Sequence, residues 1–249
     1  MVFESLALFS RIRSSDAATL LLPNIERPDS AERIARRRAD RVRVNEPSLV
    51  LLTAKRAVDI AGASIGLLVF APLFIGIAIA IKATSRGPVF FRQKRYGYHN
   101  RRFQILKFRT MFVHLSDSRG TRQTTADDPR ITPIGRILRK TSLDELPQLI
   151  NVLIGDMSLV GPRPHVPGML AGGMLYEELT PYYFQRHNMR PGLTGLAQVS
   201  GYRGSTAIPH SAIERLDHDL QYIEKWSLWL DLAIILRTAR REFISGSGD

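Results

Sequence analysis

The longest apolar stretch of the chain runs from Ala57 to Ile81, where Asp59 and Ser64 are the only polar side chains. A straight helix of that length would cover roughly 37 Å, enough to cross the hydrocarbon core of a bilayer. Pro72 lies inside the stretch, where a proline removes a helical hydrogen bond and bends the helix. The pattern therefore predicts a membrane helix, 54–83, that is broken at Pro72.

Basic residues flank the apolar stretch Ala57–Ile81 on both sides. They are Lys55 and Arg56 before it, and Lys82, Arg86, Arg92, Lys94 and Arg95 after it. The positive-inside tendency places both ends in the cytoplasm, which a helix that enters and leaves by one face satisfies. Its arms, roughly 22 and 14 Å long, are each too short to cross. We expect a re-entrant helix; the alternatives are a helix that spans the bilayer and the buried core helix of a soluble protein.

The pattern after this helix is that of a folded domain over 84–245. Two apolar, aromatic-rich runs, Pro88–Arg92 and Phe103–Phe108, are separated by turn-forming residues and predict a β-hairpin. Apolar positions between Leu146 and Leu153 recur at helical spacing and predict a helix. The polar stretch 113–130 between these elements predicts a loop.

Two further helices are predicted towards the C-terminus, over 169–187 and over Ile213–Ile244. Trp226 and Trp229 lie on the apolar side of the last one, where they would anchor at a membrane interface or pack on the core. Together the elements predict an α+β fold that is mainly helical with a small β-hairpin. The re-entrant helix and interfacial helices would embed it in the membrane.

The amino-acid composition gives the chain a strong positive charge. The 249 residues include 35 Lys and Arg against 23 Asp and Glu, a formal net charge of +12, which attracts phosphorylated substrates, anionic lipids or nucleic acid. An Arg-rich run, Glu32–Arg43, lies in the extension 1–53, which we expect to be partly flexible or to dock on an anionic leaflet. This extension shows no secretory signal. The sequence has no nucleic-acid-binding motif, and without cysteine it has no disulfide or thiolate metal site.

Two adjacent carboxylates, Asp144 and Glu145, are the strongest candidates for chemistry. Pro147 is tolerated only near the start of a helix, so we expect that helix to begin near 142–144 with both acids at its N-terminus. Such acids commonly cap the helix. Alternatively, in a site that binds phosphate, one carboxylate could attack phosphorus while the other holds Mg²⁺.

Several cations surround these acids in sequence. They are Lys107, Arg109, Arg136, Arg139, Lys140 and Arg163. Arg163 lies between two prolines in Gly-Pro-Arg-Pro (161–164), a stiff frame that limits where its guanidinium can go. Because a planar bidentate donor suits phosphate, Arg163 is the first candidate for phosphate binding.

Five ordered blocks of the chain resemble one known family. The blocks are KRAVDI (55–60), GPVFFRQKRYG (87–97), FQILKFRTM (103–111), TSLDELPQLINVLIGDMSLVGPRP (141–164) and RPGLTGLAQVSGYRG (190–204). In the sequence and order of these blocks, the chain from Ala54 to Ile244 resembles the bacterial sugar transferases, also called monotopic phosphoglycosyl transferases.

The resemblance implies a two-step reaction at the Asp-Glu dyad. Asp144 would attack the β-phosphorus of a UDP-sugar and release UMP, and a polyprenyl (undecaprenyl) phosphate would then take the sugar phosphate from the enzyme. Glu145 would be the Mg²⁺ ligand. Arg163 would bind substrate phosphate, with Lys107 and Arg109 as further candidates for that task.

Other positions follow from the same resemblance. Asp156 would organise the site, or is an ordinary turn residue, and Pro162 and Pro164 would frame Arg163. Members of the family carry a re-entrant helix broken at a proline, often after Ser; here Ala71 precedes Pro72.

The resemblance also indicates a substrate class and a location. The segment 165–175 with the 190–204 block is similar to members that transfer glucose or galactose phosphate to start exopolysaccharide synthesis. An N-acetylated amino sugar is the alternative donor, and a basic membrane scaffold without activity is the alternative class. We expect the catalytic domain to face the cytoplasm at the inner membrane, in contact with anionic lipids and compatible with a homo-oligomer, and to bind no nucleic acid.

Overall fold

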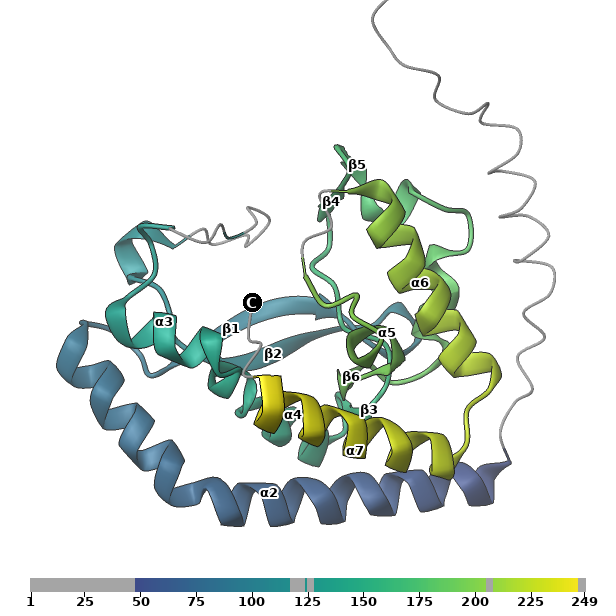
Figure 1. Cartoon of the computed structure of the whole chain (residues 1–249), viewed down its shortest axis with the longest axis horizontal. Coiled ribbons are helices and arrows are strands. Elements are labelled where there is room, and N and C mark those ends of the chain that lie inside the picture. Colours follow the sequence, from purple (N-terminus) through teal and green to yellow (C-terminus); the bar gives the residue numbers. More distant parts are fainter. Residues whose placement is uncertain (1–47, 117–123, 125–127, 205–207, 246–249) are drawn as a thin grey trace, which may run out of the picture.

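The computed structural model describes residues 48–116, 124, 128–204 and 208–245, so the extension predicted over 1–53 lies almost wholly outside them. The helices and strands, in chain order, are α2 (Leu49–Thr84), β1 (Phe90–Tyr96), β2 (Arg102–Phe108), α3 (Pro133–Lys140), α4 (Gln148–Ile154), β3 (Ser158–Val160), β4 (Leu170–Ala171), β5 (Met174–Leu175), β6 (Gly192–Thr194), α5 (Leu196–Val199), α6 (Pro209–Glu224) and α7 (Leu228–Ser245). Figure 1 shows a mainly helical molecule around small sheets, as the sequence predicts.

Helix α2 is long enough and apolar enough to cross a membrane. It starts at Leu49, before the expected residue 54, and its assignment continues without a break through Pro72. Figure 1 shows that it bends in its second half, so that one part lies along the base of the domain and the other rises beside α3. Only 11% of its most apolar window is buried, which argues against the core helix of a soluble protein.

The predicted β-hairpin is confirmed. Strand β1 pairs antiparallel with β2 in the register Phe90 to Phe108 through Tyr96 to Arg102, and β1 runs past the expected end at Arg92. Its turn contains residues with positive φ. This hairpin matters for the site because β2 carries Lys107.

The helix predicted around 146–153 is present as α4, but it starts later than expected. A 3₁₀ turn, η3 (Leu143–Glu145), comes first, and Pro147 is the N-cap of α4. Ser142 has a left-handed backbone, with φ 55°. The two acids therefore lie in a tight turn before the helix rather than in its first α-helical turn.

The helix predicted over 169–187 is wrong. Strands β4 and β5 form a small hairpin whose turn contains Gly172 and Gly173, with φ 58° and 87°. Such left-handed positions favour glycine and interrupt a helix. Short 3₁₀ turns follow, η4 (Tyr176–Glu178) and η5 (Tyr183–Asn188). Pro181 between them disfavours helical backbone in the residue before it.

The helical tail predicted over Ile213–Ile244 is two helices, α6 and α7, joined by 225–227. Helix α6 packs into the largest hydrophobic cluster, which includes Tyr183, Leu216 and Ile234. The two tryptophans differ: Trp226 is half-buried and donates Nε1–H to Asp231, whereas Trp229 is 79% exposed.

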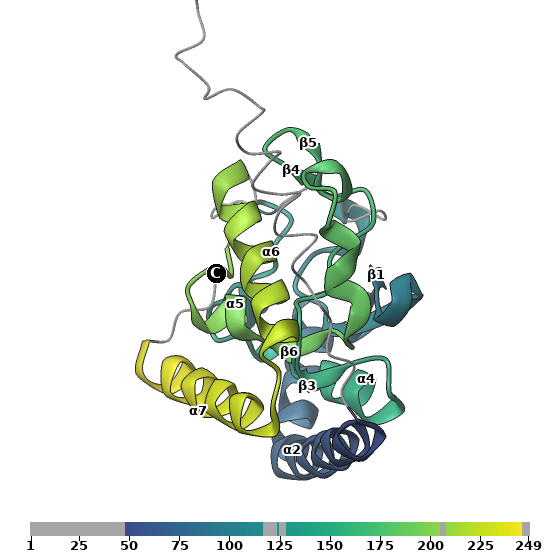
Figure 2. The ribbon, with the colours of Figure 1, turned by 90° about the vertical axis from the view of Figure 1, so that its right-hand side faces the viewer.

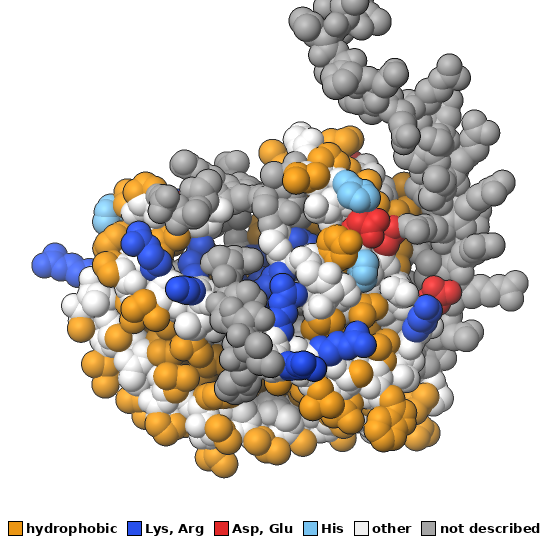
Figure 3. Space-filling model, in the orientation of Figure 1, with side chains coloured by type: hydrophobic (Ala, Val, Ile, Leu, Met, Phe, Trp, Pro, Cys, Tyr) orange, Lys and Arg blue, Asp and Glu red, His pale blue; other side chains and the backbone are white. Residues whose placement is uncertain are grey.

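The base of the molecule is apolar on its outer side. Figures 1 and 2 place α2 and α7 there, and Figure 3 shows hydrophobic side chains along the same edge. The exposed large apolar residues of these helices, which we call the basal apolar face, are Leu49, Val50, Leu51, Val58, Ile60, Ile65, Leu68, Val69, Phe70, Leu73, Ile75, Ile79, Trp229, Leu232 and Leu236.

Candidate active site

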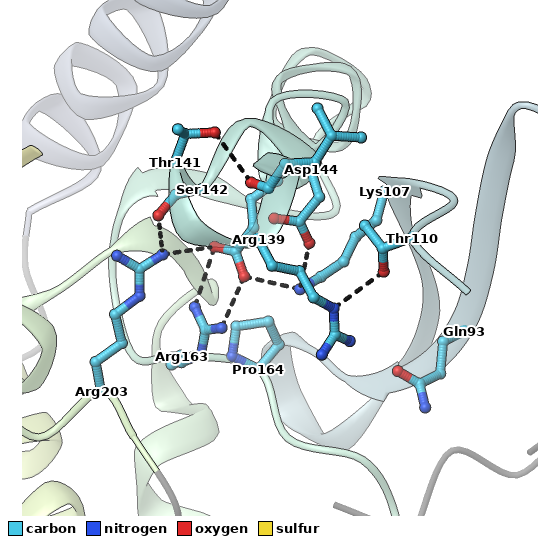
Figure 4. A network of polar contacts seen from close by, with 12 residues as sticks. Gln93, Lys107, Thr110, Arg139, Thr141, Ser142, Asp144, Arg163, Pro164 and Arg203 are labelled. Carbon is cyan, nitrogen blue, oxygen red and sulfur yellow. Dashed lines mark hydrogen bonds and ion pairs between the residues drawn. The ribbon is translucent and has the colours of Figure 1, made fainter. Parts of the chain in front are cut away.

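The acid pair lies where three parts of the chain meet. Asp144 and Glu145 are both buried in η3, directly after α3 and packed against strand β2. The left-handed Ser142 turns the chain out of α3 at this point. Figure 4 shows Lys107, Arg163 and Arg203 reaching towards this turn from different parts of the chain.

Glu145 is surrounded by positive charge. Its Oε1 lies 2.7 Å from Lys107 Nζ and 2.7 Å from Arg163 Nη2. Its Oε2 lies 3.3 Å from Arg163 Nη1, so the guanidinium contacts both oxygens. Arg203 Nη2 is 3.7 Å from Oε2 and also donates to Ser142 Oγ at 2.9 Å. Three cations around one carboxylate leave a surplus of positive charge for an anionic ligand.

Asp144 is held more loosely than its neighbour. Within the described part of the chain its one ion pair is with Lys107, whose Nζ lies 3.9 Å from Oδ2, beyond hydrogen-bonding distance. Arg139 is close enough to influence the Asp144 charge and donates its Nε–H to Thr110 Oγ1 at 3.0 Å. The Asp144 carboxylate is therefore less tightly paired than the Glu145 carboxylate.

The two carboxyl groups have opposite pKa shifts. Burial, to which the charge of Glu145 adds, raises the pKa of Asp144 above its ordinary value. Burial also disfavours the charge on Glu145, but Arg163 and Lys107 outweigh it and hold the pKa of that carboxyl well below its usual range. Adjacent carboxyl groups whose pKa values are shifted in opposite directions are typical of sites where one acid reacts and the other supplies a fixed charge.

The backbone of the Gly-Pro-Arg-Pro segment is fixed by hydrogen bonds. Four consecutive carbonyls, 162–165, accept from three elements: Gly192 N to Pro162 O at 2.9 Å, Arg186 Nη2 to Arg163 O at 2.6 Å, Arg95 Nη1 to Pro164 O at 3.2 Å, and Tyr96 N to His165 O at 3.1 Å. With φ also fixed at both prolines, Arg163 has a rigid base. The predicted framing by Pro162 and Pro164 agrees with this geometry.

Two glycines let this segment approach the neighbouring strand. A Cβ on Gly192 would lie 2.1 Å from Gly161 N, and one on Gly161 would lie 2.3 Å from Arg190 O. Both distances are far below van der Waals contact, and the obstructing atoms are backbone. Glycine is therefore required at both positions for β3 and β6 to meet and carry Arg163 to the dyad.

Arg109 and Asp156 lie away from the dyad's contacts. The Arg109 guanidinium donates to Ser85 O at 2.9 Å, to Ser85 Oγ at 3.0 Å and to Arg86 O, so it holds the C-terminal end of α2. Asp156 Oδ2 lies 3.4 Å from Asn151 Nδ2. The geometry gives both residues a supporting position; phosphate binding by Arg109 and site organisation by Asp156 remain predictions.

Arg203 is the site residue that the sequence reasoning missed. It lies in Gly-Tyr-Arg-Gly (201–204), inside a block that carried the family resemblance, but no local spacing links it to the dyad. The only available signal was an arginine in a turn rich in glycine, comparable to Arg163 between prolines.

The dyad is also the candidate metal site. No cluster of three or more acidic, His or Cys side chains occurs in the described residues. Mg²⁺ in phosphate-handling enzymes is often bound by one or two carboxylates, with substrate phosphates and water completing the shell. Glu145, the predicted ligand, fits that donor set if substrate phosphate and water supply the remaining ligands.

Comparison with known proteins concerns the chain as a whole. The family model described as bacterial sugar transferase matches residues 50–245. An exopolysaccharide production protein, PSS, of Rhizobium leguminosarum bv. phaseoli is 52% identical over 197 residues, 79% of this chain and 98% of the relative. An undecaprenyl-phosphate glucose phosphotransferase of Komagataeibacter xylinus is 50% identical over 77% of this chain, which spans 36% of that relative.

A third relative carries a different sugar in its name. The UDP-N-acetylgalactosamine-undecaprenyl-phosphate N-acetylgalactosaminephosphotransferase of Aeromonas hydrophila is 41% identical over 78% of this chain and 44% of the relative. The chain thus spans nearly all of the first relative and less than half of the other two. These matches confirm the resemblance drawn from the five sequence blocks: the chain belongs to the bacterial sugar transferase family.

Proposed function

We propose that the protein transfers hexose-1-phosphate, glucose or galactose, from a UDP-sugar to undecaprenyl phosphate, releases UMP, and so starts exopolysaccharide or capsule synthesis. The observation that carries the proposal is the asymmetric dyad: a loosely held Asp144 beside a Glu145 that is surrounded by Lys107, Arg163 and Arg203. A site of this kind suits attack on a phosphate whose negative charge must be neutralised.

In the first step, an Asp144 carboxylate oxygen forms a bond to the β-phosphorus of the donor. The bond between that phosphorus and the bridging oxygen breaks, and UMP leaves with the electron pair. In the second step, a phosphate oxygen of undecaprenyl phosphate attacks the same phosphorus. The bond to Asp144 breaks, which gives the lipid-diphosphate-sugar and frees the carboxylate. The raised pKa of Asp144 makes the ionised carboxylate a better nucleophile than an exposed aspartate.

The cations that hold Glu145 would also bind the donor diphosphate. Arg163 presents two N–H groups from a rigid backbone, and Lys107 lies between the two acids. Glu145 is the proposed Mg²⁺ ligand, and the metal would supply Lewis-acid neutralisation of the phosphate oxygens. Arg203 adds a third cation. The positive charge of the three cations therefore exceeds the negative charge of the two carboxylates before a donor binds.

We further propose that α2 is a re-entrant helix that holds the catalytic domain on the cytoplasmic side of the inner membrane. The bend of α2, the basic flanks on both sides of it and the basal apolar face support this arrangement. A lipid acceptor such as undecaprenyl phosphate presents its phosphate at the membrane surface. An enzyme seated there can reach it without extracting the lipid.

Glucose is favoured over an N-acetylated sugar by the relatives. The relative named for glucose is 50% identical to this chain and the one named for N-acetylgalactosamine is 41% identical. The N-acetylated donor is the second candidate.

The test measures UMP released from UDP-glucose, UDP-galactose and their N-acetylated counterparts by the purified full chain in nanodiscs. Reactions are run with and without Mg²⁺ and undecaprenyl phosphate, beside Asp144→Asn and the exposed control Glu224→Gln. We expect release that depends on Mg²⁺, is lost in Asp144→Asn and is retained in Glu224→Gln. No release from any UDP-sugar by folded, membrane-embedded protein would refute the proposal.

A further inference from the structure

We propose that Lys55 and Asp59 are positioning residues that join the membrane helix α2 to the strand leading into Arg163, so that the phosphate-binding arginine is held in place from the membrane side. This inference rests on the proposed function. It gives a role to the KRAVDI block, which the dyad chemistry leaves unexplained.

Asp59 is the first connection. Although it lies in the long apolar stretch of α2, it is buried. Its Oδ1 accepts from Ser158 Oγ at 2.9 Å and from Leu159 N at 2.9 Å. Both partners belong to β3, and that strand continues directly into Gly-Pro-Arg-Pro. A single carboxylate of α2 thus binds the strand through one side-chain donor and one backbone donor.

Lys55 is the second connection, one helical turn earlier on the same side of α2. Its buried ammonium donates to Val160 O at 3.1 Å and pairs with Asp231 Oδ2 at 2.6 Å. Tyr222 completes the cluster: its hydroxyl lies 2.7 Å from Asp231 Oδ1 and 3.0 Å from Val160 O. Lys55 therefore binds the last residue of β3 and joins it to α7.

These contacts fix the rotation of α2 about its axis. An apolar helix face packs with little directional preference, so apolar contact alone would allow α2 to turn or slide on the domain. Arg56 donates to Val152 O at 2.6 Å and to Leu153 O at 2.8 Å and so holds α2 on α4, whereas Lys55 and Asp59 hold it on β3. Buried charges are costly to separate, and their bonds have a defined geometry. Because β3 ends at Val160 and Arg163 follows after Gly161 and Pro162, a shift of the strand is passed to the guanidinium.

The expected effect is on catalysis rather than on membrane association. A displacement of about 1 Å at a catalytic group can reduce the rate about 100-fold, so Asp59→Leu should lower kcat/KM for the donor by about 10- to 100-fold. Asp59→Asn keeps an Oδ1 acceptor for both donors and should stay within about threefold of wild type. Ser64→Leu changes the other polar side chain of the apolar stretch, which is exposed, and serves as the matched control.

The experiment uses the full chain in nanodiscs. It measures UMP-release kinetics, liposome flotation, and hydrogen exchange of the peptide covering 158–163, whose Gly161 N–H is bonded to Thr194 O. We expect Asp59→Leu and Lys55→Met to float with liposomes, to exchange faster over 158–163 and to lose kcat/KM. Ser64→Leu should match wild type, and Asp59→Asn should stay within about threefold of it. If Asp59→Leu does not fold, Ser158→Ala removes one of its two partners and should show the same changes to a smaller extent.

Several results would overturn the inference. Unchanged exchange over 158–163 in Asp59→Leu would do so, as would equal losses in Ser64→Leu or in Asp59→Asn. Failure of Asp59→Leu to associate with liposomes would show that the residue serves anchoring instead. Hydrogen exchange needs no turnover, so an inactive wild-type protein would refute the proposed function while leaving this connection open to the same test.

Discussion

The ion pair between Arg186 and Asp219 is predicted to be essential for both stability and the donor site. Both side chains are 1% exposed, and Arg186 Nη2 lies 2.5 Å from Asp219 Oδ2. Arg186 also donates to Arg163 O at 2.6 Å and contacts His165 Nδ1. Replacing Arg186 by Met therefore leaves a buried carboxylate without its partner and releases the backbone that carries Arg163.

The expected loss of folding stability follows from the burial of this ion pair. Removing one member of a buried ion pair costs about 3–5 kcal/mol, a large share of the roughly 5–15 kcal/mol that stabilises a folded domain. For a domain of this size, about 2–4 °C is lost per kcal/mol. Arg186→Met should thus lower Tm by roughly 6–20 °C. The control Arg237→Met, at an exposed position of α7, should shift Tm by no more than about 2 °C because surface changes usually stay within about 0.5 kcal/mol.

The assay is thermal unfolding of the full chain in one detergent, followed by tryptophan fluorescence. It compares Arg186→Met, Asp219→Leu, the double variant that combines them, and the control Arg237→Met. The pair should recover at least about 1 kcal/mol relative to the sum of the single losses, because it removes the unpaired charge. Strict additivity of the two losses, or an Arg186→Met shift no larger than that of Arg237→Met, would refute the reasoning.

Three further predictions concern the dyad and the membrane helix. Because burial raises the pKa of Asp144 above 3.8, the nucleophile protonates at a higher pH than an exposed aspartate. The kcat for UMP release should therefore fall as the pH falls through that pKa; a rate unchanged down to pH 3.8 in folded protein contradicts this. Arg203→Ala should raise the donor KM about tenfold, which corresponds to about 1.4 kcal/mol for a charge-assisted contact. Arg203→Lys should restore part of the lost affinity for the donor. An unchanged KM in titrations of UMP release would exclude Arg203 from the donor site. Since the chain has no cysteine, single cysteines at Leu51 and Ser85 can be labelled selectively in oriented vesicles. Both should react from the cytoplasmic side, and labelling from opposite sides would show a spanning helix.

The parts of the fold that the sequence predicts are those with a strong local pattern. The hairpin strands alternate between the two sides of the sheet, and α4 has apolar residues at helical spacing, so both are predicted. The failure over 169–187 has a local cause as well, since the turn at Gly172 and Gly173 interrupts residues that are otherwise compatible with a helix. The separation of α6 from α7 involves neither proline nor glycine; its only local mark is Ser227, whose Oγ accepts from Leu230 N at 3.1 Å and caps α7.

The site residues likewise divide into those that the sequence predicts and those that only tertiary packing brings together. Asp144, Glu145 and Arg163 lie in one contiguous block, and the structure brings them together. Arg203 reaches Ser142 from 61 residues away in sequence, a contact set only by tertiary packing. Arg109 is two residues from Lys107, but it follows the end of β2, and its guanidinium is taken by the end of α2 instead. Proximity in sequence therefore does not place the Arg109 guanidinium beside the dyad, and its role in phosphate binding stays a prediction.

The most direct test of the central claim is the intact mass of the full chain after incubation with UDP-glucose and Mg²⁺ in the absence of undecaprenyl phosphate. The account predicts a mass increase equal to one hexose phosphate, located by peptide mapping at Asp144. It should be absent from Asp144→Asn and removed when undecaprenyl phosphate is added. Release of UMP without this adduct, or an adduct on another residue, would contradict nucleophilic attack by Asp144.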